Sequence, residues 1–286
     1  MTLASDASSD DGPGAPAGGR IIYRHTLLVR VTHWVNAICL AVLLMSGLQI
    51  FNAHPALYWG NRSEFDKPLL AMTAREDGGG SVTTGVTTIL GKSFTTTGVL
   101  GASRDESGQL SERGFPGWIT IPSYQDLATG RRWHFFFAWL LVLNGAVYVA
   151  NLFVRRHLKD FLPSGRELRS IPQSIREHIR LHFPKGAAAL RYNVLQKFAY
   201  LSVLVALPIL ALAGLTMSPA LDAAFPWLLS LFGGRQSART VHFIVAFYLV
   251  GFVVVHVAMV LVSGFLNNMI SMITGRYAIE EDRHEA

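Results

Sequence analysis

Four stretches of about twenty apolar residues constrain this chain more than any other feature. An α-helix rises about 1.5 Å per residue, so about 20 apolar residues cross the roughly 30 Å hydrocarbon core of a bilayer. Half of the 286 residues are hydrophobic and only 15% are charged, which is too apolar for a water-soluble domain of this length. We therefore predict an all-α integral membrane four-helix bundle. The predicted spans are residues 31–51, 133–154, 198–217 and 240–263.

The distribution of charge predicts how the spans cross the membrane. The net charge is +6, but the basic residues flank the spans rather than cover a soluble face, so we expect no nucleic-acid partner. Residues 155–197 carry ten Lys or Arg against three acids, whereas residues 52–132 carry eight of each sign. By the positive-inside rule, residues 155–197 and both termini are expected to be cytoplasmic. Residues 52–132 then form a long extracytoplasmic loop.

The tails and the long loop complete the expected organisation. Residues 1–20 have the composition of a disordered tail, residues 277–286 are expected to form a cytoplasmic tail, and the transmembrane domain occupies residues 21–276. The 52–132 loop is far longer than a usual connection, and its alternating Thr and Val residues allow a short hairpin. It is either a docking surface for an extracytoplasmic partner or a flexible insertion.

Two segments outside the spans predict short helices at the membrane surface. An isoleucine recurs at every fourth position over residues 171–179, followed by Phe183, with basic residues on the other faces, which is typical of an interfacial amphipathic helix. Ser218 and Pro219 have the residue types of an N-cap and a first helical position, and predict a second one. Neither segment is long enough to add a span.

Four histidines lie within the spans, where a polar ring needs a partner. His33 and His134 stand near the starts of the first and second spans, and His242 and His256 share the fourth. Because successive spans alternate in direction, His134 should pair with His242 near the outer face and His33 with His256 near the inner face. His242 and His256 are fourteen positions apart, which makes almost four full turns and a rise of about 21 Å, so both rings face the bundle interior.

Paired imidazoles at two depths are the ligands that b-type haems require, because such a haem is held by an axial ligand on each side of its plane. Any one of these histidines is explained equally well as a buried polar residue bonded to a carbonyl. Four histidines at matched depths favour two haems b.

Cys39 is the only cysteine, so a covalent C-x-x-C-H site does not exist, and we expect Cys39 to pack as a small apolar residue.

Other residue types fit this interpretation without proving it. Six further histidines lie outside the spans and are expected to be solvated or interfacial: His25, His54, His157, His178, His182 and His284. The arginines beside the span histidines are candidate contacts for haem propionates, although snorkelling explains them equally well: Arg30, Arg131, Arg132 and Arg239. One glycine in each span allows close approach of a porphyrin or of another helix: Gly47, Gly145, Gly214 and Gly251.

Four runs of sequence resemble the four-helix, di-haem cytochrome b family, which includes the membrane subunits of nickel-iron hydrogenases, formate dehydrogenases and thiosulfate reductases. The runs are RVTHWVNA…LLMSGLQI, RRWHFFFAWLLVLNG, RYNVLQKFAY and GRQSARTVHF…VHVAM. The similarity covers about residues 20–276. It implies that the haem ligands come from helices one, two and four, which are His33, His134, His242 and His256, and that the protein lies in a bacterial inner membrane.

The resemblance also implies a quinone site near the cytoplasmic haem, formed by polar side chains at the start of the third helix. Asn193 and Gln196 stand there, three positions apart and on one helical face. The 52–132 loop differs from the short loops of hydrogenase and formate dehydrogenase subunits. It is more similar to that of members found beside a molybdopterin oxidoreductase of the sulfite oxidase type, which suggests such a partner.

The expected function is electron transfer between the quinone pool and an extracytoplasmic redox partner through two haems. The direction of transfer does not follow from the residues, nor does an enzymatic activity of the chain beyond a role as the cytochrome b subunit of an oxidoreductase. One alternative is a stand-alone membrane cytochrome that reacts directly with a small molecule. Another is a haem-free bundle for proton or metal transport, but no Asp or Glu lies in the four spans.

Overall fold

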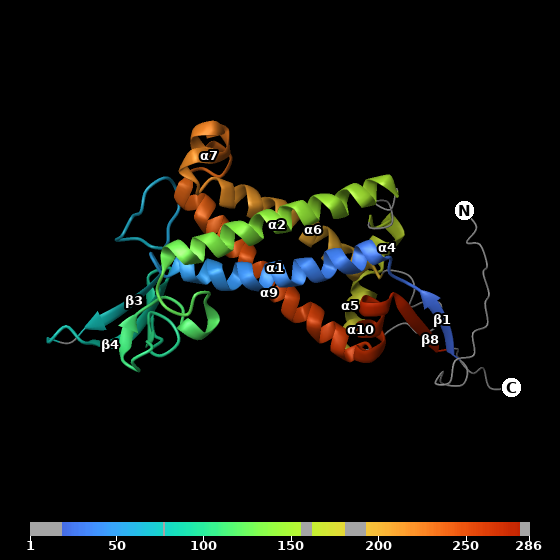
Figure 1. Cartoon of the computed structure of the whole chain (residues 1–286), viewed down its shortest axis with the longest axis horizontal. Coiled ribbons are helices and arrows are strands. Elements are labelled where there is room, and N and C mark those ends of the chain that lie inside the picture. Colours follow the sequence, from blue (N-terminus) through green and yellow to red (C-terminus); the bar gives the residue numbers. More distant parts are fainter. Residues whose placement is uncertain (1–18, 77, 156–161, 181–192, 281–286) are drawn as a thin grey trace. The chain divides into compact units, whose positions relative to one another are not determined.

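The computed structural model describes residues 19–76, 78–155, 162–180 and 193–280 (Figure 1). The long helices are α1 (Leu27–Phe51), α2 (Leu127–Val154), α6 (Val194–Leu215) and α9 (Arg235–Val262). The short helices are α4 (Gly165–Arg169), α5 (Ile171–Ile179), α7 (Pro219–Ala224), α8 (Pro226–Leu231) and α10 (Phe265–Thr274), with a 3-10 turn at Gly117–Ile119. The strands are β1 (Gly19–Tyr23), β2 (Ala56–Leu57), β3 (Leu70–Glu76), β4 (Val82–Ile89), β5 (Lys92–Thr95), β6 (Ala102–Arg104), β7 (Leu110–Glu112) and β8 (Arg276–Glu280).

The four long helices confirm the four predicted spans. Each is long and apolar enough to cross a membrane, and the helices begin four to six residues before the predicted spans. Polar capping explains the early start of α2, because the carboxylate of Asp126 accepts hydrogen bonds from the N–H and hydroxyl of Thr129 at 3.1 and 2.7 Å. In the most apolar window of α9 only 6% of the residues are buried within the protein, so most of that surface is left for hydrocarbon.

The chain divides into two compact units. One comprises residues 1–30, 163–197 and 257–286, and the other comprises residues 31–162 and 198–256. The second unit contains most of the four long helices and every strand from β2 to β7.

The first unit contains a two-stranded antiparallel sheet made from both ends of the chain. Strand β1 pairs with β8 in the register Gly19 to Glu280 through Tyr23 to Arg276. The side chain of Asn267 in α10 donates to the carbonyl of Ala278 at 2.8 Å and accepts from its N–H at 3.0 Å, which ties β8 to α10.

This sheet corrects the expected limits of the two tails. Residues 19–20 and 277–280 are strand rather than tail, and Tyr277 and Ile279 are residue types that favour extended pairing. Residues 1–18 and 281–286 lie outside the described residues.

The amphipathic helix predicted in the first unit is confirmed as α5, with Pro172 in its first turn. It follows α4, whose capping box joins Ser164 and Glu167. Lys197 also donates to Glu167 at 2.8 Å. This hydrogen bond, together with those from Ser164, lowers the pKa of Glu167 to about 2. Phe183, which extended the predicted pattern, lies outside the described residues.

In the second unit, Ser218 and Pro219 are the N-cap and first residue of α7, as predicted. The Ser218 side chain makes no capping hydrogen bond. Pro226 begins a second helix, α8, so the predicted single segment is two short helices separated at Phe225.

The connection between α1 and α2 is a folded β region, which we call the sheet region (residues 52–126). Strands β2 to β5 form an antiparallel sheet in sequential order, and β6 pairs with β7. The hairpin allowed by the Thr and Val pattern is β4–β5, closed by the two residues Leu90 and Gly91, both with positive φ. The all-α class therefore describes the spans and not this connection. In Figure 1 strands β3 and β4 lie beyond one end of α1 and α2.

The apolar core of the sheet region lies against the ends of the helices. Phe51 at the end of α1 contacts Phe115 and the α9 residue Phe243, with ring centroids 5.7 and 4.9 Å apart. Leu57 and Met72 of the sheet are buried in the same cluster. The sheet region is thus packed on the bundle rather than tethered to it.

A buried arginine joins the sheet region to α1. Arg113, only 4% exposed, donates to the side-chain oxygens of Gln49 at 3.0 Å and Thr120 at 2.8 Å. Gln49 in turn donates to the carbonyl of Tyr124 at 2.8 Å. Burial lowers the pKa of Arg113, but an arginine remains charged, so these hydrogen bonds are charge-assisted.

The sheet region also caps the start of α9. The carbonyl of Gly60 accepts from the N–H groups of Gln236 and Ser237 at 3.0 and 3.1 Å, and the N–H of Gly60 donates to the Ser237 hydroxyl at 2.7 Å. One turn later Thr240 donates to the carbonyl of Tyr58 at 2.6 Å. These contacts hold the end of α9 that carries His242.

We predict that Arg113→Leu destabilises the sheet region by roughly 2–4 kcal/mol, because it leaves the oxygens of Gln49 and Thr120 buried without their donor. Limited proteolysis of the purified protein should show faster cleavage within residues 52–126. The control is Arg104→Leu, which removes an exposed arginine that donates to the nearby carbonyl of Gly108. Equal protease resistance of the two variants would contradict the prediction.

Candidate cofactor site

The first histidine pair joins α2 and α9. The ring centroids of His134 and His242 lie 6.2 Å apart, with 58° between the ring planes. Both rings are braced by the other two long helices. The Ser46 hydroxyl of α1 lies 3.1 Å from Nδ1 of His134, and Nδ1 of His242 donates to the carbonyl of Leu210 in α6 at 2.8 Å. All four long helices therefore contribute to this pair.

The second pair joins α1 and α9. The ring centroids of His33 and His256 lie 6.3 Å apart, with 55° between the ring planes. Phe252 stacks on His256 with a centroid distance of 5.9 Å, and Trp34 contacts the His33 ring edge-on at 5.4 Å. Nδ1 of His33 is buried and has no hydrogen-bond partner among the described residues.

The structure thus brings together the two pairs that the sequence predicted, and their spacing fits an axial ligand set. With a metal–nitrogen bond of about 2 Å and about 1.1 Å from ring nitrogen to ring centre, two imidazoles on opposite sides of one metal have centroids about 6 Å apart. Within the described residues no cluster of three or more His, Cys, Asp or Glu could hold a metal ion. Two-histidine sites suit a haem, because the porphyrin supplies the other metal ligands.

Two of the four candidate glycines create space for the histidine rings themselves. A Cβ atom on Gly47 would lie 3.3 Å from Cε1 of His134, and one on Gly214 would lie 3.2 Å from Cε1 of His242. Those glycines therefore let α1 and α6 approach the rings closely. A Cβ on Gly145 or Gly251 would meet nothing within 4 Å, so these two glycines border open space.

The candidate propionate arginines fall into two groups. Arg30 donates to the carbonyl of Ile273, and Arg239 donates to the carbonyl of His54 and lies over the ring of Phe51. Both are therefore engaged with the protein. The other two, Arg131 and Arg132, are exposed at the start of α2, where Arg131 lies over the ring of Phe135. Contact with a propionate stays a prediction for all four.

The two candidate quinone residues form the start of α6. Asn193 Oδ1 accepts from the N–H of Leu195, and Gln196 Oε1 accepts from the N–H of Asn193, both at 3.1 Å. This reciprocal arrangement caps the helix in the manner of a capping box, except that Asn193 binds the second helical N–H rather than the third. It uses the two side-chain oxygens and leaves the amide N–H₂ groups as the atoms that a quinone oxygen could meet.

Sequence reasoning missed two polar features of the second unit. Asn144 in α2 donates to the side-chain oxygen of Asn36 at 2.7 Å and to the carbonyl of Thr32 at 2.8 Å, which links α1 and α2 close to His33. The signal was present as two asparagines in apolar spans.

The second missed feature is His54, which is not simply solvated. Its ring stacks on Tyr58 with a centroid distance of 5.6 Å, and its Nε2 is buried without a partner among the described residues. Burial and the nearby Arg239 guanidinium lower the pKa of His54. The side chains of His157, His178, His182 and His284 lie outside what the structure describes.

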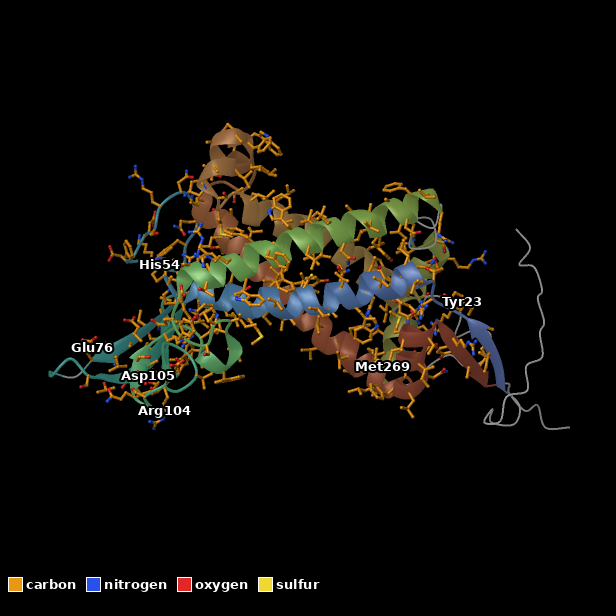
Figure 2. The ribbon with its side chains drawn as sticks, in the orientation of Figure 1. Tyr23, His54, Glu76, Arg104, Asp105 and Met269 are labelled. Atoms are coloured by element: carbon orange, nitrogen blue, oxygen red, sulfur yellow. The ribbon has the colours of Figure 1, made fainter. Side chains whose placement is uncertain are left out.

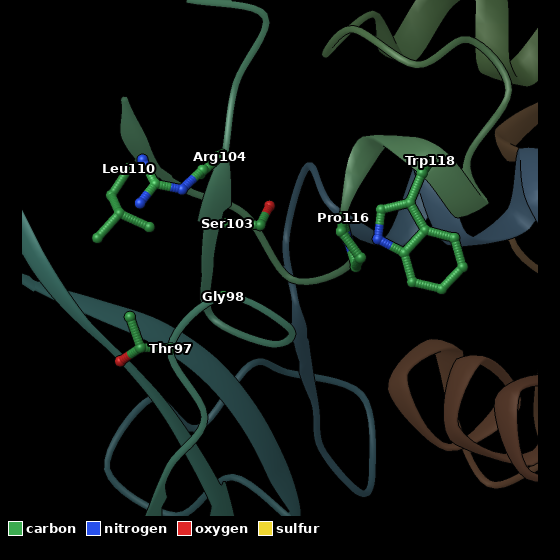
Figure 3. A pocket seen from close by; sticks show the side chains of 7 residues that line it. All are labelled: Thr97, Gly98, Ser103, Arg104, Leu110, Pro116 and Trp118. Carbon is green, nitrogen blue, oxygen red and sulfur yellow. The ribbon is translucent and has the colours of Figure 1, made fainter. Parts of the chain in front are cut away.

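The sheet region carries a cleft of about 380 Å³. Figure 3 shows Pro116 and Trp118 on one side of it, Arg104 and Leu110 on the other, and Ser103 between them. Trp118 is 78% exposed, and the Ser103 hydroxyl is buried with no partner among the described residues. Tryptophan and arginine, which here line opposite sides of one cleft, are the residue types enriched among the anchor residues of protein interfaces.

The far end of the sheet region is polar. Figure 2 places Glu76, Arg104 and Asp105 there, away from His54 at the helix ends. Arg104 thus belongs both to this end and to the cleft. A partner that approaches the sheet region from water would meet this surface.

A family model described as prokaryotic cytochrome b561 matches residues 24–275. The chain belongs to this family. Its members are b-type cytochromes, so membership implies that the chain binds haem b. The four long apolar helices agree with a multi-pass membrane protein. The family match does not give the number of haems.

The cytochrome is also similar to a curated bacterial protein. It is 29% identical over 252 residues to the putative protein-methionine-sulfoxide reductase subunit YedZ1 of Azospira oryzae, and the alignment covers 88% of this chain and 96% of that protein. The similarity therefore includes the sheet region as well as the spans.

Proposed function

We propose that this cytochrome is a di-haem electron-transfer subunit that connects the quinone pool to an extracytoplasmic redox partner. The observation that carries the proposal is one geometry found twice: two histidine pairs with centroid distances of 6.2 and 6.3 Å and plane angles of 58° and 55°. Membership of the cytochrome b561 family supports haem b as the cofactor. The count of two haems rests on the two pairs.

The roles of the residues follow from the hydrogen bonds around the rings. His134 and His242 would hold one haem and His33 and His256 the other, and bound haem b supplies one-electron transfer. Since Nδ1 of His134 and of His242 is hydrogen-bonded, Nε2 is the nitrogen left to bind iron. The role of the chain's own residues is to orient the histidine rings and to hold both histidine pairs within the long apolar helices.

The proposed partner is an extracytoplasmic reductase, of the molybdopterin type suggested by the family resemblance. The similar protein from Azospira oryzae is named as a subunit of a protein-methionine-sulfoxide reductase, which supports a reductase partner. The folded sheet region supports a docking role over a flexible insertion, because its packing and buried hydrogen bonds hold the Trp118 cleft in one shape. The quinone site is proposed at Asn193 and Gln196.

The haem assignment is tested by a dithionite-reduced minus oxidised spectrum of the purified protein, with haem counted per polypeptide. We expect two haems b. His134→Ala and His242→Ala should each leave one haem, with the same spectral component lost, while His33→Ala and His256→Ala should remove the other. His25→Ala, outside the spans, is the control and should retain both. A flat spectrum, or equal loss of both haems from every variant, would overturn the assignment.

The quinone site is tested by separating capping from quinone binding. Asn193→Asp keeps a capping oxygen but removes the amide donor, so it should slow quinol-dependent haem reduction about tenfold, the effect of losing one hydrogen bond of about 1.4 kcal/mol, with haem content unchanged. Gln196→Glu makes the same change at the second position. Wild-type rates in both variants would show that these residues only cap α6.

The docking surface is tested by Trp118→Ala. We expect electron transfer from the reduced cytochrome to its purified reductase to require at least tenfold more reductase for half-maximal rate, because exposed tryptophans at an interface contribute about 2 kcal/mol or more. The matched control is Phe94→Ala, an exposed aromatic on β5 outside the cleft. Equal effects of the two variants would place the docking surface elsewhere.

A further inference from the structure

Ser46 contacts, through its hydroxyl, Nδ1 of His134 and the carbonyls of Val42 and Leu43, the last at 3.3 Å. Its side chain is fully buried. Its hydroxyl donates to the carbonyl of Val42 one turn earlier in α1, at 2.7 Å. With its one proton on this shorter contact, the hydroxyl oxygen that faces Nδ1 of His134 at 3.1 Å is left to accept. Nδ1 of His134 therefore carries the proton.

The partner ring is held in the same way by the backbone. The carbonyl of Leu210 can only accept, so Nδ1 of His242 also carries its proton. Both rings of this pair thus donate an Nδ1–H bond. In the other pair, Nδ1 of His33 is buried with no partner among the described residues. The two pairs match in spacing and differ in the hydrogen bonding behind the rings.

Hydrogen bonds behind a metal-bound imidazole change the properties of the metal. An acceptor on Nδ1–H raises the basicity of the ring and makes it a stronger donor through Nε2. A stronger donor stabilises ferric over ferrous iron, which lowers the reduction potential of the haem.

We propose that Ser46 is a positioning residue for His134 that makes the haem of the His134–His242 pair the more negative of the two. This inference rests on the di-haem assignment of the proposed function. Ser46 fixes the ring tautomer and its orientation, while Gly47, the next residue, provides the space in which the ring lies.

The test is an optical redox titration of the purified protein, in which two one-electron steps should resolve. Ser46→Ala should move the more negative step to a more positive potential and leave the other step and the haem content unchanged. The control is Ser202→Ala, which removes a span hydroxyl that bonds Tyr248 at 2.5 Å instead of a histidine, and should move neither step.

If Ser46→Ala does not retain haem, a second variant tests the same inference. Ser46→Cys fills the same space with a weaker acceptor, so it should shift the same step in the same direction by a smaller amount. Unchanged potentials with both haems bound, or a shift of the less negative step, would overturn the inference while leaving the di-haem assignment in place. Absence of haem from the unaltered protein would overturn the proposed function instead.

Discussion

An unpaired imidazole nitrogen is costly inside hydrocarbon, and the arrangement of the long helices around His134 and His242 can be understood from that cost. At His134 and His242 one nitrogen is satisfied by the Ser46 hydroxyl and the Leu210 carbonyl. The other nitrogen of each ring is left for a ligand. Two helices supply the rings, and the other two supply the acceptors and the glycines that allow close approach, so the pair depends on all four helices.

The sheet region contributes to the same arrangement from outside the spans. Gly60 and Tyr58 bind the first turns of α9 through Ser237 and Thr240, and Thr240 stands two residues before His242. Arg113 binds Gln49 in α1, one turn after Ser46. A folded extramembrane region that clamps two helix ends therefore also limits how those helices can rotate, and so where their histidines point.

The two histidine pairs are alike in spacing but not in surroundings. One has hydrogen-bonded Nδ1 atoms on both rings, and the other has aromatic neighbours and a buried Nδ1 without a partner among the described residues. Two haems with identical surroundings would have identical reduction potentials. Different hydrogen bonding to their histidine ligands would make those potentials differ. In the proposed di-haem subunit, this difference in hydrogen bonding would make the two reduction potentials unequal.

The sequence by itself determined the membrane class, the four spans and the paired histidines. Each of these follows from a property of a single stretch of sequence: its apolar length, its helical periodicity or the presence of a polar ring, which is rare in lipid. The cap position at Ser218 is local in the same sense. Only the tertiary structure decided that the 52–126 connection folds as a sheet on the helix ends, that Arg113 is buried, and that Ser46 bonds His134. Each of those contacts joins residues distant in the chain, and hydrogen bonding between distant residues leaves no periodic signal in the sequence.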